Sequence, residues 1–262
     1  MPDVHLMRAA KIESKSEVSG SMVNFLNKSA YENKFEKHVK EMPFEDAVKY
    51  HVGGIERYYV IGAIECRLME MEGLSNGNYL IDLGCGSGRL AGALRSKFDI
   101  KYLGLEIVER LVAHCRTQIP DYRFEVPDGF SILERDGQAD FVTAFSLFTH
   151  LLHEQTYLYI KDARRVLKPG GKLILSFLEY RIAAHRTLFL AKVRSSHLDR
   201  PLVVFNDREG LNFYAESLGF SDIRFIDGTE KIFDFPNPVK LPDGVTISGD
   251  RSFGQSICVM TK

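Results

Sequence analysis

The chain has 262 residues, of which 45% are apolar and 26% are charged, and its 34 basic and 35 acidic side chains give a formal net charge of −1. This length and composition fit one soluble α/β domain with added elements, and the charge argues against nucleic-acid binding driven by net charge. No apolar run approaches the ~18 residues of a membrane helix, and the first residues lack the apolar core of a secretory signal. The four cysteines form no CxxC pair, so we expect no disulfide, no metal site and a reduced, cytoplasmic protein.

The N-terminal part of the sequence changes character near residue 44. Residues 1–43 are polar and rich in serine, and we interpret them as a lead-in with a short helix around 22–39. Residues 44–75 carry apolar side chains at helical spacing, interrupted by Gly53-Gly54. We therefore expect two cap helices that meet at these glycines.

Strands and helices alternate in the central part, 78–178. The predicted strands are 79–83, 101–106, 122–126, 139–146 and 172–177, and the predicted helices are 90–98, 108–118, 129–134 and 153–167. Alternation of this kind predicts right-handed βαβ units that share a parallel sheet.

The C-terminal part continues with helices at 180–193 and 208–218 and with strands at 221–226 and 255–261. Residues 227–254 contain three prolines, which are not tolerated in central strands, and we expect an edge loop or hairpin there. The predicted domain, 44–262, is a doubly wound, mostly parallel seven-stranded sheet with helices on both faces and an N-terminal helical cap.

The most informative segment is LIDLGCGSGRL at 80–90, where a strand runs through Asp82 into alternating glycines. Gly84, Gly86 and Gly88 permit unusual backbone angles and leave space for a ligand against the main chain. In open α/β sheets, ligands bind at the carboxyl ends of the strands near the point where the strand order reverses.

Glu106 ends the second predicted strand, 24 positions after Asp82. An acid at this place can accept hydrogen bonds from both ribose hydroxyls of a nucleotide-like ligand. A dinucleotide fold would use G-x-G-x-x-G/A, which Gly86 to Ala91 satisfies, whereas counting from Gly84 puts Arg89 at the sixth position. An NAD-dependent oxidoreductase therefore stays an alternative, as does a plain turn with a solvated glutamate.

Residues 80–90 resemble the first motif of class I (Rossmann-like) S-adenosylmethionine-dependent methyltransferases, an acidic residue followed by G-x-G-x-G. The segment RRVLKPGG at 164–171 resembles the helix end that precedes the fifth strand of this family, and the resemblance covers about 78–177. It implies S-adenosylmethionine as cofactor and S-adenosylhomocysteine as product.

The resemblance also implies which residues contact the cofactor. Asp82 and the glycine loop would hold the amino-acid end, and Glu106 would hold the ribose. Asp128 would lie near the adenine amino group, although Val126-Pro127 precedes it where the family commonly has a Gly-Asp pair, so the backbone of Gly129 or Phe130 is an alternative. The full set of predicted cofactor residues is Asp82, Gly84, Cys85, Gly86, Gly88, Glu106, Ile107, Asp128, Gly129 and Ser146.

Histidines after the fourth strand are the candidates for a general base, because histidine titrates near neutrality. His150 is the first candidate and His153 the second, although a packing or capping role for His150 and a helix-starting role for His153 are the simpler interpretations. The weaker candidates for the acceptor pocket are Tyr50, His51, Tyr58 and Arg181, which helix packing or a solvated surface would also explain.

We therefore expect methyl transfer to a small-molecule acceptor, with oxygen as the first choice of accepting atom and a protein or RNA acceptor as the second. A non-catalytic scaffold that retains the cofactor fold is a further alternative. We expect no nucleic-acid or membrane partner. The cap helices and residues 227–254 are the candidate contacts of a homodimer.

Overall fold

The computed structural model describes residues 28–194 and 201–262. The helices are α1 (Lys28–Glu41), α2 (Phe44–His51), α3 (Tyr58–Met71), α4 (Arg89–Arg95), α5 (Glu109–Gln118), α6 (His153–Val166), α7 (Ala183–Val193) and α8 (Arg208–Leu218). The strands are β1 (Tyr79–Leu83), β2 (Lys101–Leu105), β3 (Arg123–Glu125), β4 (Ala139–Ala144), β5 (Leu167–Phe177), β6 (Asp222–Ile226), β7 (Val239–Lys240), β8 (Thr246–Ile247) and β9 (Ser256–Thr261).

Seven strands form one sheet in the order β3-β2-β1-β4-β5-β9-β6. The first five strands pair in parallel, and β9 lies antiparallel between β5 and β6. The chain therefore builds outward from β1 in one direction and then crosses to β4 on its other side. The predicted doubly wound, mostly parallel sheet is confirmed, and its switch point lies between β1 and β4, where such folds bind ligands.

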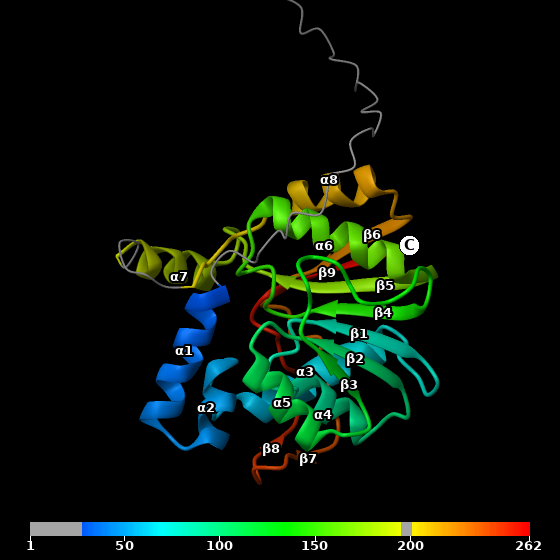
Figure 1. Cartoon of the computed structure of the whole chain (residues 1–262). Coiled ribbons are helices and arrows are strands. Elements are labelled where there is room, and N and C mark those ends of the chain that lie inside the picture. Colours follow the sequence, from blue (N-terminus) through cyan, green and yellow to red (C-terminus); the bar gives the residue numbers. More distant parts are fainter. Residues whose placement is uncertain (1–27, 195–200) are drawn as a thin grey trace, which may run out of the picture.

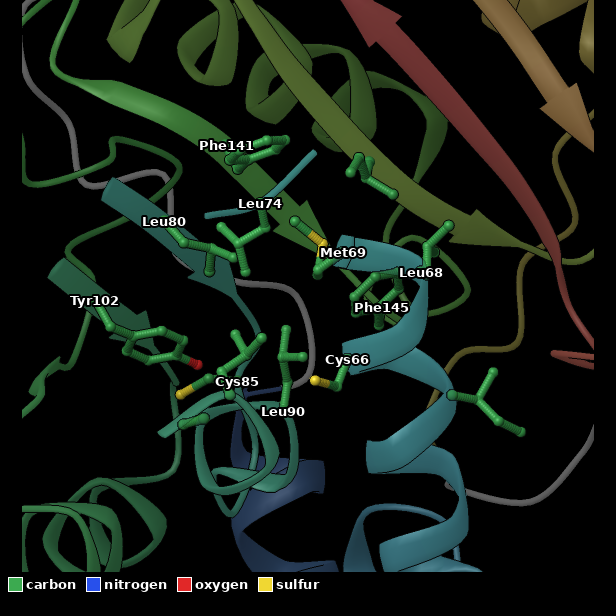
Figure 2. Packing of buried hydrophobic residues seen from close by; sticks show 14 of the residues in the cluster. Cys66, Leu68, Met69, Leu74, Leu80, Cys85, Leu90, Tyr102, Phe141 and Phe145 are labelled. Atoms are coloured by element: carbon green, nitrogen blue, oxygen red, sulfur yellow. The ribbon is translucent and has the colours of Figure 1, made fainter. Parts of the chain in front are cut away.

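Helices bury both faces of the sheet, as expected for parallel strands that are apolar along their whole length. On one face, Leu68 and Met69 of α3 and Leu90 of α4 pack toward Leu80 and Phe141 of the sheet (Figure 2). On the other face, α6 and α8 contribute a second buried cluster. The sheet is thus held rigidly, which fixes the loops at its carboxyl edge.

The N-terminal helices form a separate small cluster at that edge. Phe35 of α1 packs with Ala47 and Val48 of α2, and these side chains contact Val108 and Leu111 at the start of α5. Figure 1 shows α1, α2 and α7 gathered at one end of the sheet. Residues 28–41, which the sequence placed in a polar lead-in, therefore fold as part of the structure around the site, while 22–27 of the predicted first helix lie outside the described residues.

The predicted helix at 129–134 is wrong, because this segment has no helical hydrogen bonding. Side chains of α6 hold its backbone instead: Asp162 accepts a hydrogen bond from the Ile132 N–H at 2.6 Å, and Arg165 donates to the Ile132 carbonyl at 2.9 Å.

Residues 227–254 contain the predicted hairpin as β7 and β8, and they bury phenylalanines such as Phe233 and Phe253 in the α3 side of the core. Among the described residues, no helix is long and apolar enough to span a membrane.

Candidate functional site

A cavity of about 670 Å³ opens at the carboxyl ends of the parallel strands. Helices α1 and α2 form one wall, and loops after β1, β2, β4 and β5 contribute much of the remaining lining. The residues predicted from sequence that line it are Tyr50, His51, Asp82, Gly84, Cys85, Gly86, Glu106, Ile107, Ser146 and His150. Candidates from four separate segments of the chain thus meet in one place.

The glycine loop takes a backbone course that requires glycine. Gly84, Gly86 and Gly88 have φ of 68°, 57° and 79°, in the left-handed region that residues with a Cβ rarely adopt. A Cβ on Gly86 would lie 2.6 Å from the Val52 side chain, which follows α2. The cap therefore rests directly on the loop and leaves no room for a side chain at Gly86.

Glu106 is fixed by the same loop. Its Oε2 accepts the Gly86 N–H at 3.0 Å and its Oε1 accepts the Val108 N–H at 2.9 Å. Burial raises the pKa of this carboxyl, although the backbone donors counteract the rise. Each carboxylate oxygen has a further lone pair, so Glu106 can accept two hydroxyl hydrogen bonds from a neighbouring ligand.

Asp82 lies deeper, in β1, with 3% of its surface exposed. The Tyr102 hydroxyl donates to its Oδ2 at 2.6 Å and the Thr143 hydroxyl donates to its Oδ1 at 2.9 Å. Burial raises the pKa of Asp82 to about 7 despite these two donors. This carboxyl can therefore change its charge near neutral pH.

Arg89 joins the cap to the glycine loop. At the first position of α4, its guanidinium pairs with Glu65 of α3 and donates to the Val52 carbonyl at 2.8 Å. The exposed fractions of the two charged side chains are 12% for Arg89 and 1% for Glu65. Arg89, which breaks the dinucleotide pattern when it is counted from Gly84, therefore holds α3 and the end of α2 against the loop.

Ser146, after β4, has φ of 58°, the only described residue other than glycine with positive φ. Its N–H donates to the Ser176 hydroxyl at 2.7 Å, and its hydroxyl accepts from the Gln255 amide at 3.1 Å. The Ser176 hydroxyl in turn donates to Oε1 of the Gln255 side-chain amide at 2.8 Å. This network ties the ends of β4 and β5 to the chain before β9, and sequence reasoning missed Gln255 because no local pattern marks it.

His150 lines the cavity. Its Nδ1 lies 2.7 Å from the Leu202 carbonyl oxygen, which can only accept, so Nδ1 carries the proton and Nε2 is the basic nitrogen. Burial lowers the pKa of His150, with smaller contributions from Lys34 and Lys192. The imidazole is therefore neutral near pH 7 and able to accept a proton.

Six predicted residues do not line the cavity. Gly88 immediately precedes α4, and a Cβ on it would lie 3.2 Å from the Cys115 sulfur. The Tyr58 hydroxyl contacts the loop from outside, where it donates to the Ser87 carbonyl at 3.2 Å. Asp128 and Gly129 border a separate groove beside α6, while the neighbouring Pro127 does line the cavity.

The last two, His153 and Arg181, are exposed at the start of α6 and after β5. Conversely, α1 contributes cavity residues that the sequence did not indicate, notably Tyr31 and Lys34. Among the described residues, no group of three or more potential metal ligands is present.

Residues 81–175 match the family model of a methyltransferase domain. The ubiquinone biosynthesis O-methyltransferase of Coxiella burnetii is 28% identical over 138 residues, which are 51% of this chain and 57% of that protein. The 27-O-demethylrifamycin SV methyltransferase of Amycolatopsis mediterranei is 33% identical over 115 residues, 42% of each chain. This chain thus spans only about half the length of the curated relatives it matches.

Solved structures show the same fold. A SAM-dependent methyltransferase from Methanosarcina mazei superposes with a TM-score of 0.52 at 18% identity, covering 74% of this chain and 96% of that one. The magnesium protoporphyrin IX methyltransferase from Synechocystis PCC 6803, solved with bound S-adenosylhomocysteine, gives 0.57 at 15% identity, covering 90% and 97%. The chain contains a class I S-adenosylmethionine-dependent methyltransferase domain.

The cavity of this methyltransferase domain fits the cofactor of its family. Gly84 and Gly86 leave the loop without side chains, and Glu106 keeps two lone pairs for hydroxyls beside that loop. The match to methyltransferases also argues against the dinucleotide alternative, which now rests only on the Gly86–Ala91 pattern, because Arg89 is paired with Glu65 at the sixth position counted from Gly84.

Proposed function

We propose that this protein transfers a methyl group from S-adenosylmethionine to a hydroxyl oxygen of a small molecule. The observation that carries the proposal is that one cavity contains both Glu106 beside the glycine loop and His150 with a free basic nitrogen. The donor and the base would thereby meet in the same cavity.

The donor would lie along the carboxyl ends of β1 and β2. Glu106 would accept the ribose hydroxyls, with Ile107 beside it, and the loop from Gly84 through Gly86 would border the amino-acid end above Asp82. When bound, the donor supplies a methyl group on a sulfonium, which needs no further activation. The residues therefore have to position the two reactants and exclude water rather than create a nucleophile on the protein.

His150 would act on the acceptor. Its Nε2 would take the hydroxyl proton as the new carbon–oxygen bond forms and the carbon–sulfur bond breaks, which leaves an imidazolium and an ether. The Leu202 carbonyl would keep the ring in the required tautomer and orientation. The similarity to the ubiquinone biosynthesis O-methyltransferase and to the 27-O-demethylrifamycin SV methyltransferase supports oxygen as the accepting atom.

The test is transfer of labelled methyl from S-adenosylmethionine to a panel of phenols and alcohols. His150→Gln should lower turnover by about 10²–10⁴-fold, the usual range for loss of a general base, with donor affinity retained. His153→Gln should keep turnover, because that side chain is exposed outside the cavity. Unchanged turnover of His150→Gln, or a parallel loss of turnover and donor affinity, would remove His150 as the base.

A further inference from the structure

The wall of the cavity formed by α1 and α2 contains polar atoms that no protein group satisfies. The Tyr31 hydroxyl and the Nδ1 atoms of His38 and His51 are buried without a hydrogen-bond partner in the described part of the chain. All three side chains line the cavity. Leaving a buried polar group unpaired costs free energy, so these atoms point to a bound molecule that supplies their partners.

The same wall is electrically positive. Lys34 lies three residues after Tyr31 on α1, lines the cavity, and forms no ion pair with any described residue. Burial lowers the pKa values of His38, His51 and His150, and the positive charge of Lys34 lowers them further. The pKa of His51 falls to about 3.

Positive charge also reaches this wall from α7, because Lys192 lowers the pKa of Lys34 and of His150. No carboxylate is among the described charges that act on His51 or His150, whereas Glu41 acts on His38 and Glu106 acts on Tyr31. The acidic side chains of the cavity, such as Asp82 and Glu106, lie in β1 and directly after β2, where the donor would bind. A ligand that complements the α1–α2 wall therefore carries negative charge.

The cavity lining also includes apolar side chains. They are Leu147, Leu151, Leu178, Leu188 and Val203. An apolar or aromatic body fits such a surface, whereas a highly polar sugar or nucleotide would leave its own groups without partners.

We propose that the acceptor is a hydroxy acid with an apolar or aromatic body, whose carboxylate binds Lys34 and the Tyr31 hydroxyl under α1 and whose hydroxyl faces His150. The neutral imidazole of His51 would donate a further hydrogen bond from Nδ1. A carboxylate fits better than a phosphate, because this wall offers one ammonium, one hydroxyl and neutral imidazoles rather than a cluster of cations. This inference deepens the proposed function and rests on it.

The experiment uses the full chain saturated with S-adenosylhomocysteine and measures binding of matched probes by calorimetry. Hydroxybenzoates and hydroxycinnamates are compared with the corresponding uncharged carboxamides. The carboxylates should bind about tenfold or more tightly, as expected for a charge-assisted contact, and Lys34→Gln and Tyr31→Phe should each remove most of this preference.

Two control variants separate binding from folding. Lys37→Gln removes a charge from the same helix, at a side chain that is 71% exposed and pairs with Glu41, and it should keep the carboxylate preference. Tyr122→Phe removes another buried, unpaired hydroxyl, one that does not line the cavity, and it should also keep the preference. Because Tyr31→Phe deletes a hydroxyl with no protein partner, it should not weaken the fold.

Each other outcome overturns the assignment. Carboxamides that bind as tightly as carboxylates, hydroxyphenyl phosphates that bind more tightly than carboxylates, or a panel in which no carboxylate binds would each contradict a carboxylate site. Binding of S-adenosylhomocysteine is measured first, without a probe. If it binds and the preference is absent, only the acceptor assignment fails, whereas failure of S-adenosylhomocysteine to bind would refute the proposed function as well.

Discussion

The buried carboxyl of Asp82 should make the stability of the free protein depend on pH, and Asp82→Asn should remove that dependence. Burial raises the pKa of Asp82 from 3.8 to about 7, while an unfolded chain returns it to its ordinary value. Asparagine resembles the protonated acid, and the Tyr102 and Thr143 hydroxyls can both rotate to pair with its amide.

The sign follows from proton binding. Between pH 3.8 and about 7 the folded state holds a proton that the unfolded state has lost, so stability is greatest at low pH and falls as pH rises through about 7. Each pKa unit corresponds to about 1.4 kcal/mol. Between about pH 5 and pH 7, Asp82 alone should therefore lower the free energy of unfolding by about 2 kcal/mol.

Urea denaturation of both proteins at about pH 5, 6, 7 and 8 measures this effect. The difference between wild type and Asp82→Asn isolates Asp82, since the other titrating groups are common to both. Asp121→Asn, at an exposed carboxylate that pairs with Arg95, controls for the loss of one negative charge and should follow the wild-type curve. Parallel pH profiles for wild type and Asp82→Asn would refute the reasoning, because the carboxyl would then ionise equally in both states.

Three further substitutions test the site. Glu106→Gln should weaken S-adenosylhomocysteine binding by about 1–3 kcal/mol in calorimetry, and unchanged affinity would remove Glu106 from the ribose. Glu65→Ala should lower the free energy of unfolding by about 3–5 kcal/mol in urea, because it leaves Arg89 buried without its partner; a loss below about 1 kcal/mol would show that the pair is effectively solvated. Gly86→Val should abolish S-adenosylhomocysteine binding while circular dichroism stays native, because its Cβ would lie 2.6 Å from Val52 and its φ of 57° is unfavourable; retained binding would show the loop to be only a turn.

Local patterns in the sequence predict the sheet and the glycine loop well. The segments 79–83 and 208–218 are predicted with the bounds that the structure has, because an apolar run before glycines and a helix closed by Gly219 are strong local signals. The place of Glu106 follows from the same logic, since parallel strands end at one edge of the sheet. These features depend on residues close together in the chain.

The parts that sequence did not predict depend on contacts between distant residues. The α6 side chains that hold Ile132 lie 30 or more positions away, so 129–134 looked helical by itself. Tyr31 reaches the cavity only because Phe35 buries one side of α1 against α2. Gln255 is positioned by Ser146, which follows β4, and by Ser176 of β5. No periodicity along the chain carries such information.

The measurement that tests the central claim most directly is calorimetric titration of the full chain with S-adenosylhomocysteine, with NAD as the parallel ligand and Glu106→Gln as the matched variant. We expect micromolar binding of S-adenosylhomocysteine, on the order of −8 kcal/mol, weaker binding by the variant, and none of NAD. Binding of NAD alone would return the Gly86–Ala91 pattern to a dinucleotide role. Binding of neither ligand would contradict a donor site formed by the glycine loop and Glu106.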